Sequence, residues 1–451
     1  MGVLRCAGVL AALALLAAGS AGGVACAASA GANAPATLSA GGQTRHIDEL
    51  QAAQLLFAAG RLADAKKVLL DLRKARPNDP EVLFLLGSVA VAQKDYPSAI
   101  HLFRLILVRR PGAVRVRLEL GRAFFLAKDY DNAERQFRFA LAGRLPPAVR
   151  ANVQRYLYVI RLSRTWSYNL SVSLAPDTDL NAGPSIQTVS LFGLPFELSK
   201  EAQRKSGVGV TVDAGGEWSP RVSRTLWLRA GAQLDTSDYP DGAFDDTTLS
   251  GYAGVRFISG KWDVSPLATY FRRWYGGHVY NDGAGASLQA TYYVTQRVAL
   301  SGALTGQYVS FGPPPGQSGP ALSASLGALY TLSPTSFVSG QISVAREWAE
   351  FGAYANTAVQ LKLGYYRDLP AGFSVSVGPS WTRVAYDARL AAFPVARVDN
   401  QWGVEATVLN RRIDIAGFTP RLAYTYTLNR SDLPLYAYDR NRFELGFTRA
   451  F

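Results

Sequence analysis

The chain has 451 residues, and its 47 Lys and Arg against 34 Asp and Glu give a formal charge of +13. Because 48% of the residues are hydrophobic and only 18% are charged, the composition excludes a disordered or acidic protein. With three His, two Cys and one Met, it offers few residues for metal or redox chemistry, which argues against most enzyme classes.

The charge is unevenly placed along the chain. Residues 1–45 hold 2 basic and no acidic residues, residues 46–164 hold 21 and 11, and residues 165–451 hold 24 and 23. All eight Trp fall in the last block and both Cys in the first. These shifts predict a leader, a basic module and an aromatic module that is nearly neutral.

The first block has the layout of a secretory signal peptide. Arg5 precedes an apolar run that ends in small residues, Ala25-Cys26-Ala27, which predicts a signal peptide over residues 1–27. An alternative treats Gly23 to Cys26 as a lipobox, with Cys26 acylated, although Gly23 stands where a large aliphatic residue is expected. Residues 28–45 are small and polar, which predicts a flexible linker.

Residues 46–164 contain an internal repeat with a period of 34 residues. A shift by this period aligns identical residues of two copies, namely Lys94-Asp95-Tyr96 with Lys128-Asp129-Tyr130, Gly87 with Gly121, Ala99 with Ala133 and Phe103 with Phe137. A weaker copy lies upstream, around Gly60 and Pro77. The period and pattern resemble the tetratricopeptide repeat (TPR). We therefore expect an all-α TPR solenoid of three repeats with a final helix near residues 148–164.

Three arginines are candidates for binding a client polypeptide on this module. Arg115 and Arg122 fall near positions that face the groove in such repeats, and Arg117 lies between them. Since the module carries a charge of +10, we expect these residues to bind an acidic or partly unfolded client. The alternative is a solvated helix face. Nucleic acid is not an expected partner, because no basic run is interleaved with aromatic residues.

Residues 165–451 show strand periodicity without a long apolar run. Phe373, Val375 and Val377 alternate with Ser374 and Ser376, and similar alternation recurs along the block. Polar faces rich in small residues, with Trp and Tyr near strand ends, are typical of an outer-membrane β-barrel. Turn signals divide the block into fourteen strands, from residues 166–175 to residues 438–451. An even number lets the first strand close on the last in an antiparallel barrel.

The links between the predicted strands alternate in length. Short links, such as Gly260 and residues 369–371, are expected to be periplasmic turns, and longer links are expected to face outside. The longest is the first link, residues 176–203. The final strand carries Phe443, Leu445, Phe447 and the terminal Phe451 on one face, which resembles the signal read by the barrel-insertion machinery. Arg449 departs from that pattern.

The whole arrangement resembles the Slam family, the surface lipoprotein assembly modulators of the type XI secretion system. The resemblance is carried by a signal peptide, a short TPR domain, a fourteen-stranded barrel and the stretch Asp177-Thr178-Asp179-Leu180-Asn181 after the first strand. It implies an outer-membrane translocon of a Gram-negative bacterium, with the TPR domain in the periplasm. Such a translocon delivers surface lipoproteins or small haem- and metal-acquisition proteins. Outer-membrane lipid, lipopolysaccharide and the insertion machinery are further expected partners.

Two other functions compete with this interpretation. One is a conduit for polysaccharide or a porin-like channel, and the other is an outer-membrane enzyme. No P-loop or nucleophile elbow is present, and His278 near Asp282 has no partnered nucleophile. Asp177, Asp179 and Asn181 have the spacing of a calcium loop, but Ala182 replaces the required Gly. The sequence therefore predicts no catalytic residues, no metal site and no cofactor.

Overall fold

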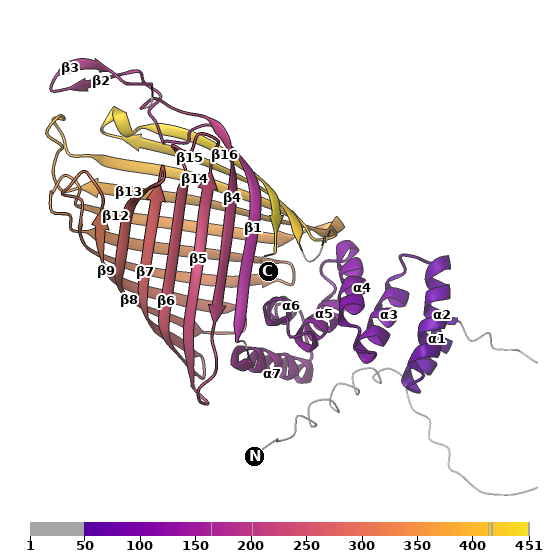
Figure 1. Cartoon of the computed structure of the whole chain (residues 1–451). Coiled ribbons are helices and arrows are strands. Elements are labelled where there is room, and N and C mark those ends of the chain that lie inside the picture. Colours follow the sequence, from indigo (N-terminus) through magenta and orange to yellow (C-terminus); the bar gives the residue numbers. More distant parts are fainter. Residues whose placement is uncertain (1–48, 164, 201, 414, 416–417, 450–451) are drawn as a thin grey trace, which may run out of the picture. The chain divides into compact units, whose positions relative to one another are not determined.

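The computed structural model describes residues 49–163, 165–200, 202–413, 415 and 418–449 (Figure 1). The predicted signal peptide and the predicted linker lie outside these residues. Within the described ranges, the chain forms a helical module followed by a β-barrel. This arrangement confirms the predicted fold class.

The helical module consists of three antiparallel helix pairs and a final helix. The helices are α1 Glu49–Ala58, α2 Leu62–Ala75, α3 Pro80–Ala92, α4 Tyr96–Arg109, α5 Val114–Leu126, α6 Tyr130–Leu141 and α7 Pro147–Ser163. A continuous core runs through all seven helices and contains the fully buried Phe103 and Phe137. Phe103 packs against Gly87 and Phe137 against Gly121 of the facing helix. The approach is so close that a Cβ on Gly87 would stand 2.7 Å from the ring of Phe103.

The repeated Lys-Asp-Tyr sequence links the two helices of a repeat. Lys94 and Lys128 each follow the end of a first helix with a φ of +64°, a left-handed conformation that stops the helix. The next residue caps the second helix, because Asp95 accepts a hydrogen bond from the backbone N–H of Ser98, and Asp129 does the same for Asn132. The sequence identity between copies therefore reflects one conserved turn geometry.

The barrel is closed and antiparallel, with fourteen strands in the described residues. Their bounds are β1 Trp166–Asp177, β4 Gly207–Trp218, β5 Leu226–Asp238, β6 Asp246–Ser259, β7 Trp262–Tyr275, β8 His278–Tyr293, β9 Val298–Phe311, β10 Gly319–Ser333, β11 Ser336–Glu347, β12 Asn356–Asp368, β13 Phe373–Tyr386, β14 Val398–Asn410, β15 Thr419–Ser431 and β16 Tyr438–Thr448. β1 pairs with β4 on one side and with β16 on the other, which closes the barrel.

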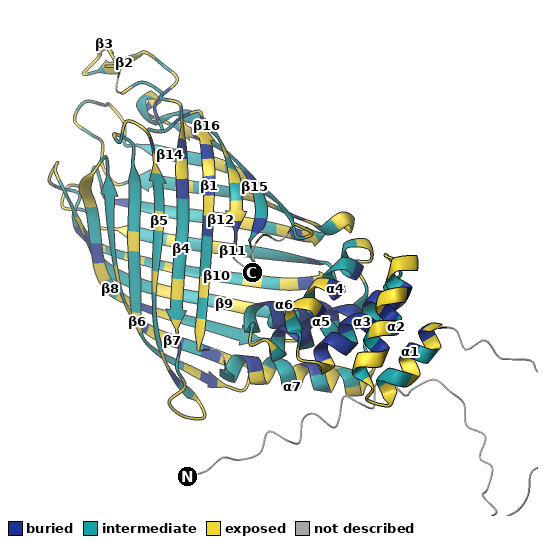
Figure 2. Ribbon diagram, turned by 45° about the vertical axis from the view of Figure 1, so that its right-hand side comes forward, coloured by how far each residue is buried: buried dark blue, intermediate teal, exposed yellow. Residues whose placement is uncertain are grey.

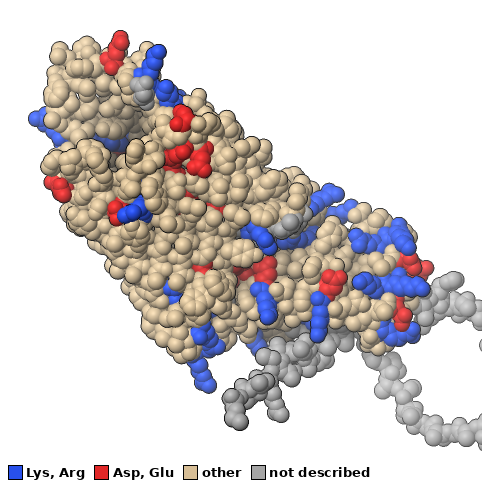
Figure 3. Space-filling view, in the orientation of Figure 1, with Lys and Arg blue, Asp and Glu red and all other residues tan. Residues whose placement is uncertain are grey.

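Alternation along each strand separates a lipid-facing side from a lumen-facing side. On β1, Leu174 is 54% exposed while its neighbour Ser173 is 3% exposed. Many outward side chains are large and apolar, such as Leu326, which is 68% exposed, and Figure 2 shows the resulting alternation of exposed and less exposed residues. In Figure 3 the visible side of the barrel is mostly uncharged, whereas Lys and Arg gather over the helices. The outward surface therefore suits a hydrocarbon environment.

The first long link contains structure that the sequence did not predict. Residues 176–203 were expected to be a loop, but they include a hairpin of β2 Thr188–Leu191 and β3 Leu194–Glu197. Val189 of this hairpin packs against Phe393 and Leu433, which come from two other links. His278 is the first residue of β8, and Asp282 lies on the same strand.

None of the helices in the described ranges is long and apolar enough to cross a membrane.

Candidate functional site

The helical module contacts the barrel at the end where the short turns lie. The guanidinium of Arg297 donates to the carbonyl of Ala142 at 2.6 Å, and Arg161 donates to the carbonyl of Gly260 at 3.1 Å. Arg161 also lies over the ring of Tyr293, 4.4 Å from its centroid. These barrel residues belong to or flank the short turns, so the module contacts the end expected to be periplasmic.

Arg117 lies at the centre of this contact. Its side chain is 3% exposed and donates to the carboxylate of Asp368, at the end of β12, at 2.8 Å. It also donates to the carbonyl of Pro111 and to the side-chain oxygen of Gln136, both at 2.9 Å. The guanidinium lies 5.0 Å from the ring centroid of Phe139. The buried charge of Arg117 is therefore compensated by a carboxylate, two further oxygen acceptors and an aromatic ring.

A second arginine extends the contact toward the barrel wall. Arg135 donates to the hydroxyl of Tyr366 and lies over its ring, 5.0 Å from the centroid. The ring of Tyr366 forms a cluster with those of Phe337 and Phe139, at centroid distances of 4.9 and 6.1 Å, and the two Phe centroids lie 6.3 Å apart. Burial lowers the pKa of Arg135 to about 10, and the positive charge of Arg411 acts in the same direction. Arg135 therefore stays protonated at neutral pH.

Asp368 gathers polar groups from both the barrel and the module. Its carboxylate accepts hydrogen bonds from the hydroxyls of Tyr366 and Ser374, in addition to the bond from Arg117. Ser374 in turn accepts from Arg411 at 3.0 Å. Asp368 therefore connects the helical module with two neighbouring strands, β12 and β13.

The other two predicted client-binding arginines lie outside this contact. Arg115 is exposed, and its guanidinium lies 4.8 Å from the ring centroid of Phe84. Arg122 is partly exposed and pairs with Glu119 at 3.4 Å. The structure thus separates Arg117, which contacts the barrel, from Arg115 and Arg122, which keep exposed surface. A client-binding role for all three stays a prediction.

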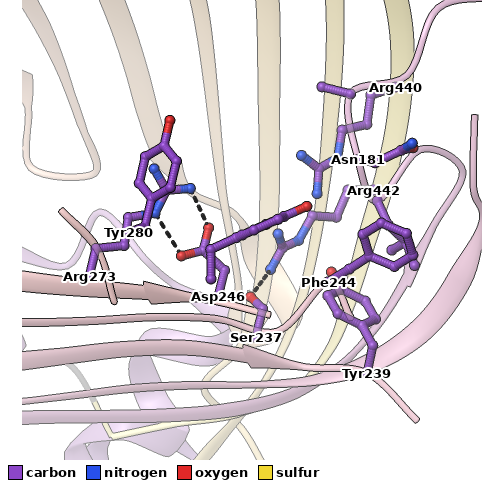
Figure 4. A pocket seen from close by; sticks show the side chains of 12 residues that line it. Asn181, Ser237, Tyr239, Phe244, Asp246, Arg273, Tyr280, Arg440 and Arg442 are labelled. Carbon is purple, nitrogen blue, oxygen red and sulfur yellow. Dashed lines mark hydrogen bonds and ion pairs between the residues drawn. The ribbon is translucent and has the colours of Figure 1, made fainter. Parts of the chain in front are cut away.

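Ion pairs line the lumen near the opposite end of the barrel. Arg440 of β16 donates to both carboxylate oxygens of Asp177 on β1, and Arg273 of β7 donates to those of Asp246 on β6. Arg442 donates to the hydroxyl of Ser237. Arg440, Arg442, Arg273, Asp246 and Ser237 line a cavity there, which Figure 4 shows from close by. The volume of this cavity is about 320 Å³.

The stretch from Asp177 to Asn181 begins at the last residue of β1 and secures that strand to β16. Asp177 pairs with Arg440, and Arg204 donates both to the carbonyl of Thr178 and to the carboxylate of Asp439. Asp179 is fully buried and accepts from the backbone N–H of Gly183; its burial raises the pKa of this carboxyl above its ordinary value. Among the described residues no group of His, Cys, Asp and Glu could hold a metal ion.

The predicted insertion signal lies on the lipid-facing side of the last strand. Phe443, Leu445 and Phe447 of β16 are 46%, 61% and 45% exposed and point outward. β16 pairs with β15 and β1, so these three side chains lie at the closing strand of the barrel. Phe451 lies outside the described residues. Recognition by insertion machinery stays a prediction.

Comparison with known proteins identifies the family. The sequence profile of the surface lipoprotein assembly modifiers matches residues 166–451, which is the whole barrel, and a tetratricopeptide repeat profile matches residues 50–114 and 96–149. The chain belongs to the surface lipoprotein assembly modifier family. The family resemblance seen in the sequence is therefore confirmed.

Several members of this family are similar to the chain over most of its length. A surface lipoprotein assembly modifier of Pasteurella multocida is 22% identical over 85% of this chain and 79% of its own length. Surface lipoprotein assembly modifier 1 of Neisseria meningitidis is 22% identical, over 84% and 78%. The hemophilin secretion modulator of Acinetobacter baumannii is 22% identical, over 82% and 78%. The similarity therefore spans both the helical module and the barrel.

Sequence reasoning missed the residues that join the module to the barrel. Tyr366 and Asp368 lie at the end of a predicted strand, and Arg135 is one of the 21 basic residues of the module, with no local pattern that distinguishes it from the others. Arg117 and Asp368 are 251 positions apart, and no local pattern connects them. One signal was available in the sequence. Asp368 lies beside a turn that was expected to be periplasmic, and the other part of the chain expected in the periplasm, the helical module, is basic.

Proposed function

We propose that this protein is an outer-membrane translocon that delivers surface lipoproteins or small secreted proteins from the periplasm to the cell surface. One observation carries the proposal: the family match spans the barrel, and a helical repeat module is fixed to the short-turn end of that barrel. The relatives named for assembly of surface lipoproteins and for secretion of hemophilin support the same class of client.

Polypeptide clients suit the chemistry of the helical module. The module carries 21 basic and 11 acidic residues, and its repeats belong to a class that stacks into extended binding surfaces. Arg115 and Arg122 supply positive charge on accessible surface, so we propose that they attract an acidic or partly unfolded segment of the client.

We propose domain boundaries that match two separate tasks, client capture and membrane passage. A cleaved signal peptide of residues 1–27, a linker of residues 28–45, a periplasmic module of residues 46–164 and a barrel of residues 165–451 place client capture and membrane passage in separate domains. The protein acts without catalysis in this scheme. Lipid and lipopolysaccharide surround the barrel, and the insertion machinery recognises its last strand.

The test is surface display in a heterologous Gram-negative host. The chain is co-expressed with a candidate client, a small secreted or lipidated protein, and intact cells are treated with protease. We expect the candidate client to be digested only when this protein is present. Equal digestion of the client in cells without this protein would refute the proposal, provided that a periplasmic marker stays intact in both.

A further inference from the structure

We infer that the pocket formed by Arg117, Arg135 and Phe139 is a peptide-binding site for an aromatic-x-acidic segment. The barrel's own segment, residues 366–368, occupies this pocket in the structure and holds the place of such a segment in a client. The inference deepens the proposed function, because it supposes a polypeptide client and names the chemistry by which the client is bound.

The occupant is recognised through two alternate side chains of one strand end. Tyr366 and Asp368 point to the same side of β12, because they are two residues apart, whereas Arg367 points to the other side. Asp368 binds Arg117, and Tyr366 binds Arg135 through its hydroxyl and Phe139 through its ring. An extended segment with a tyrosine two positions before an acidic residue reproduces all three contacts, and another aromatic residue in the place of the tyrosine reproduces the two that do not need its hydroxyl.

The polar nature of the contact is suited to exchange. A buried ion pair contributes little net stability, because desolvation of both charges offsets their attraction. At its centre the contact contains charged and aromatic groups, because the carboxylate of Asp368 binds Arg117 and the hydroxyl of Tyr366 binds Arg135. A client segment of the same chemistry can therefore replace the barrel segment with a small change in free energy.

The position of the pocket also fits this role. Asp368 ends β12 directly before the short turn of residues 369–372, at the end of the barrel that the module contacts. A client captured at this pocket would lie beside that end, and displacement of residues 366–368 would loosen the module from the rim. Binding of the client and release of the module from the barrel rim would then occur together.

Peptide binding to the full-length protein in detergent micelles tests the inference. The probe is a fluorescent peptide of residues 363–372, and the control peptide carries Asp368→Asn and Tyr366→Leu. The barrel segment competes at an effective concentration in the millimolar range, so wild-type protein should bind the probe weakly. Asp368→Asn in the protein weakens this competitor, and we expect its affinity for the probe to be about tenfold higher than that of wild type.

Two further variants complete the test. Asp387→Asn removes a carboxylate that pairs with Arg346 elsewhere on the barrel, and we expect it to bind the probe as wild type does. Adding Arg117→Gln to the Asp368→Asn protein should abolish the gain. Equal probe affinity of the wild type and Asp368→Asn, or equal binding of the two peptides, would overturn the inference. Because no display assay is involved, this failure is distinguishable from failure of the proposed function.

Discussion

The ion pair between Asp177 and Arg440 closes the barrel between its first and last strands. The Asp177 side chain is fully buried. Its carboxylate accepts hydrogen bonds from the Nε of Arg440 at 2.9 Å, from the Nη2 of Arg440 and from the backbone N–H of Asp179. Asp177→Asn removes the negative charge, preserves the side-chain volume and keeps an acceptor for Asp179. The perturbation is therefore confined to the pairing of Arg440.

The expected loss follows from the burial of the two partners. Removing one member of a buried ion pair costs about 3–5 kcal/mol, because the other charge is left uncompensated. The side chain of Arg440 is 26% exposed, so water compensates part of this loss. We expect a net cost of about 2–3 kcal/mol. Because the seam must open when the barrel unfolds, the unfolding rate should rise about 30- to 160-fold.

The assay follows the loss of detergent-resistant folded barrel with time at a fixed temperature, resolved by gel mobility. Asp246→Asn is the matched control. It removes a carboxylate that also binds an arginine in a bidentate manner. However, the pair of Asp246 with Arg273 joins neighbouring strands away from the seam, and both of its side chains are more than one-third exposed. We expect the control to change the rate by about fivefold or less. If Asp177→Asn unfolded no faster than Asp246→Asn, the reasoning would be refuted.

Three further predictions concern the helical module. Gly87→Val should destabilise it by about 3 kcal/mol, because the new side chain collides with the ring of Phe103, and thermal loss of helical circular dichroism measures this. Lys128→Gly should stabilise it by about 0.5–1 kcal/mol in the same assay, because glycine adopts the left-handed conformation without a steric penalty. Arg115→Glu with Arg122→Glu should weaken client binding about tenfold in a pull-down titration.

Each of these changes has a control or a contradicting result. Gly112→Val introduces the same side chain where no atom lies within 4 Å, and it should leave the melting temperature near that of wild type. A lower melting temperature for Lys128→Gly would contradict the argument from backbone conformation. Lys66→Glu with Lys67→Glu reverses two charges on α2 and should not change client affinity. A similar loss in both double variants would mean that net charge, and not position, governs binding.

Local patterns predicted the elements of the fold well. The repeat of Lys-Asp-Tyr predicted paired helices because the same turn geometry recurs, with lysine in the left-handed position and aspartate as the cap. Alternation such as that from Phe373 to Val377 predicted strands with one lipid-facing side. Both signals are short in range, so the sequence displays them directly.

Contacts between distant parts of the chain could not be predicted. The hairpin of residues 188–197 is held by Phe393 and Leu433, which lie more than 200 positions from Val189, and the polar-apolar alternation of its first strand, Thr188–Leu191, is only four residues long. Arg117 carried the same sequence features as Arg115, yet it is buried because its helix position faces the barrel rim. Which charged residues of the helical module contact the barrel depends on how the two domains pack against each other. The periodicity of the sequence contains no such information.

We propose that the client crosses the membrane through the lumen of the barrel, and site-directed crosslinking tests this passage most directly. The only cysteines, at positions 6 and 26, lie in the predicted signal peptide, so single cysteines can be introduced elsewhere. Ser343 and Ile342 are neighbours on β11, but Ile342 is 48% exposed on the lipid side, so Ser343 faces the lumen. During delivery, a cysteine-bearing client should crosslink to Ser343→Cys and not to Ile342→Cys. Surface delivery of the client with no crosslink at Ser343→Cys, or with equal crosslinking at both positions, would contradict the account.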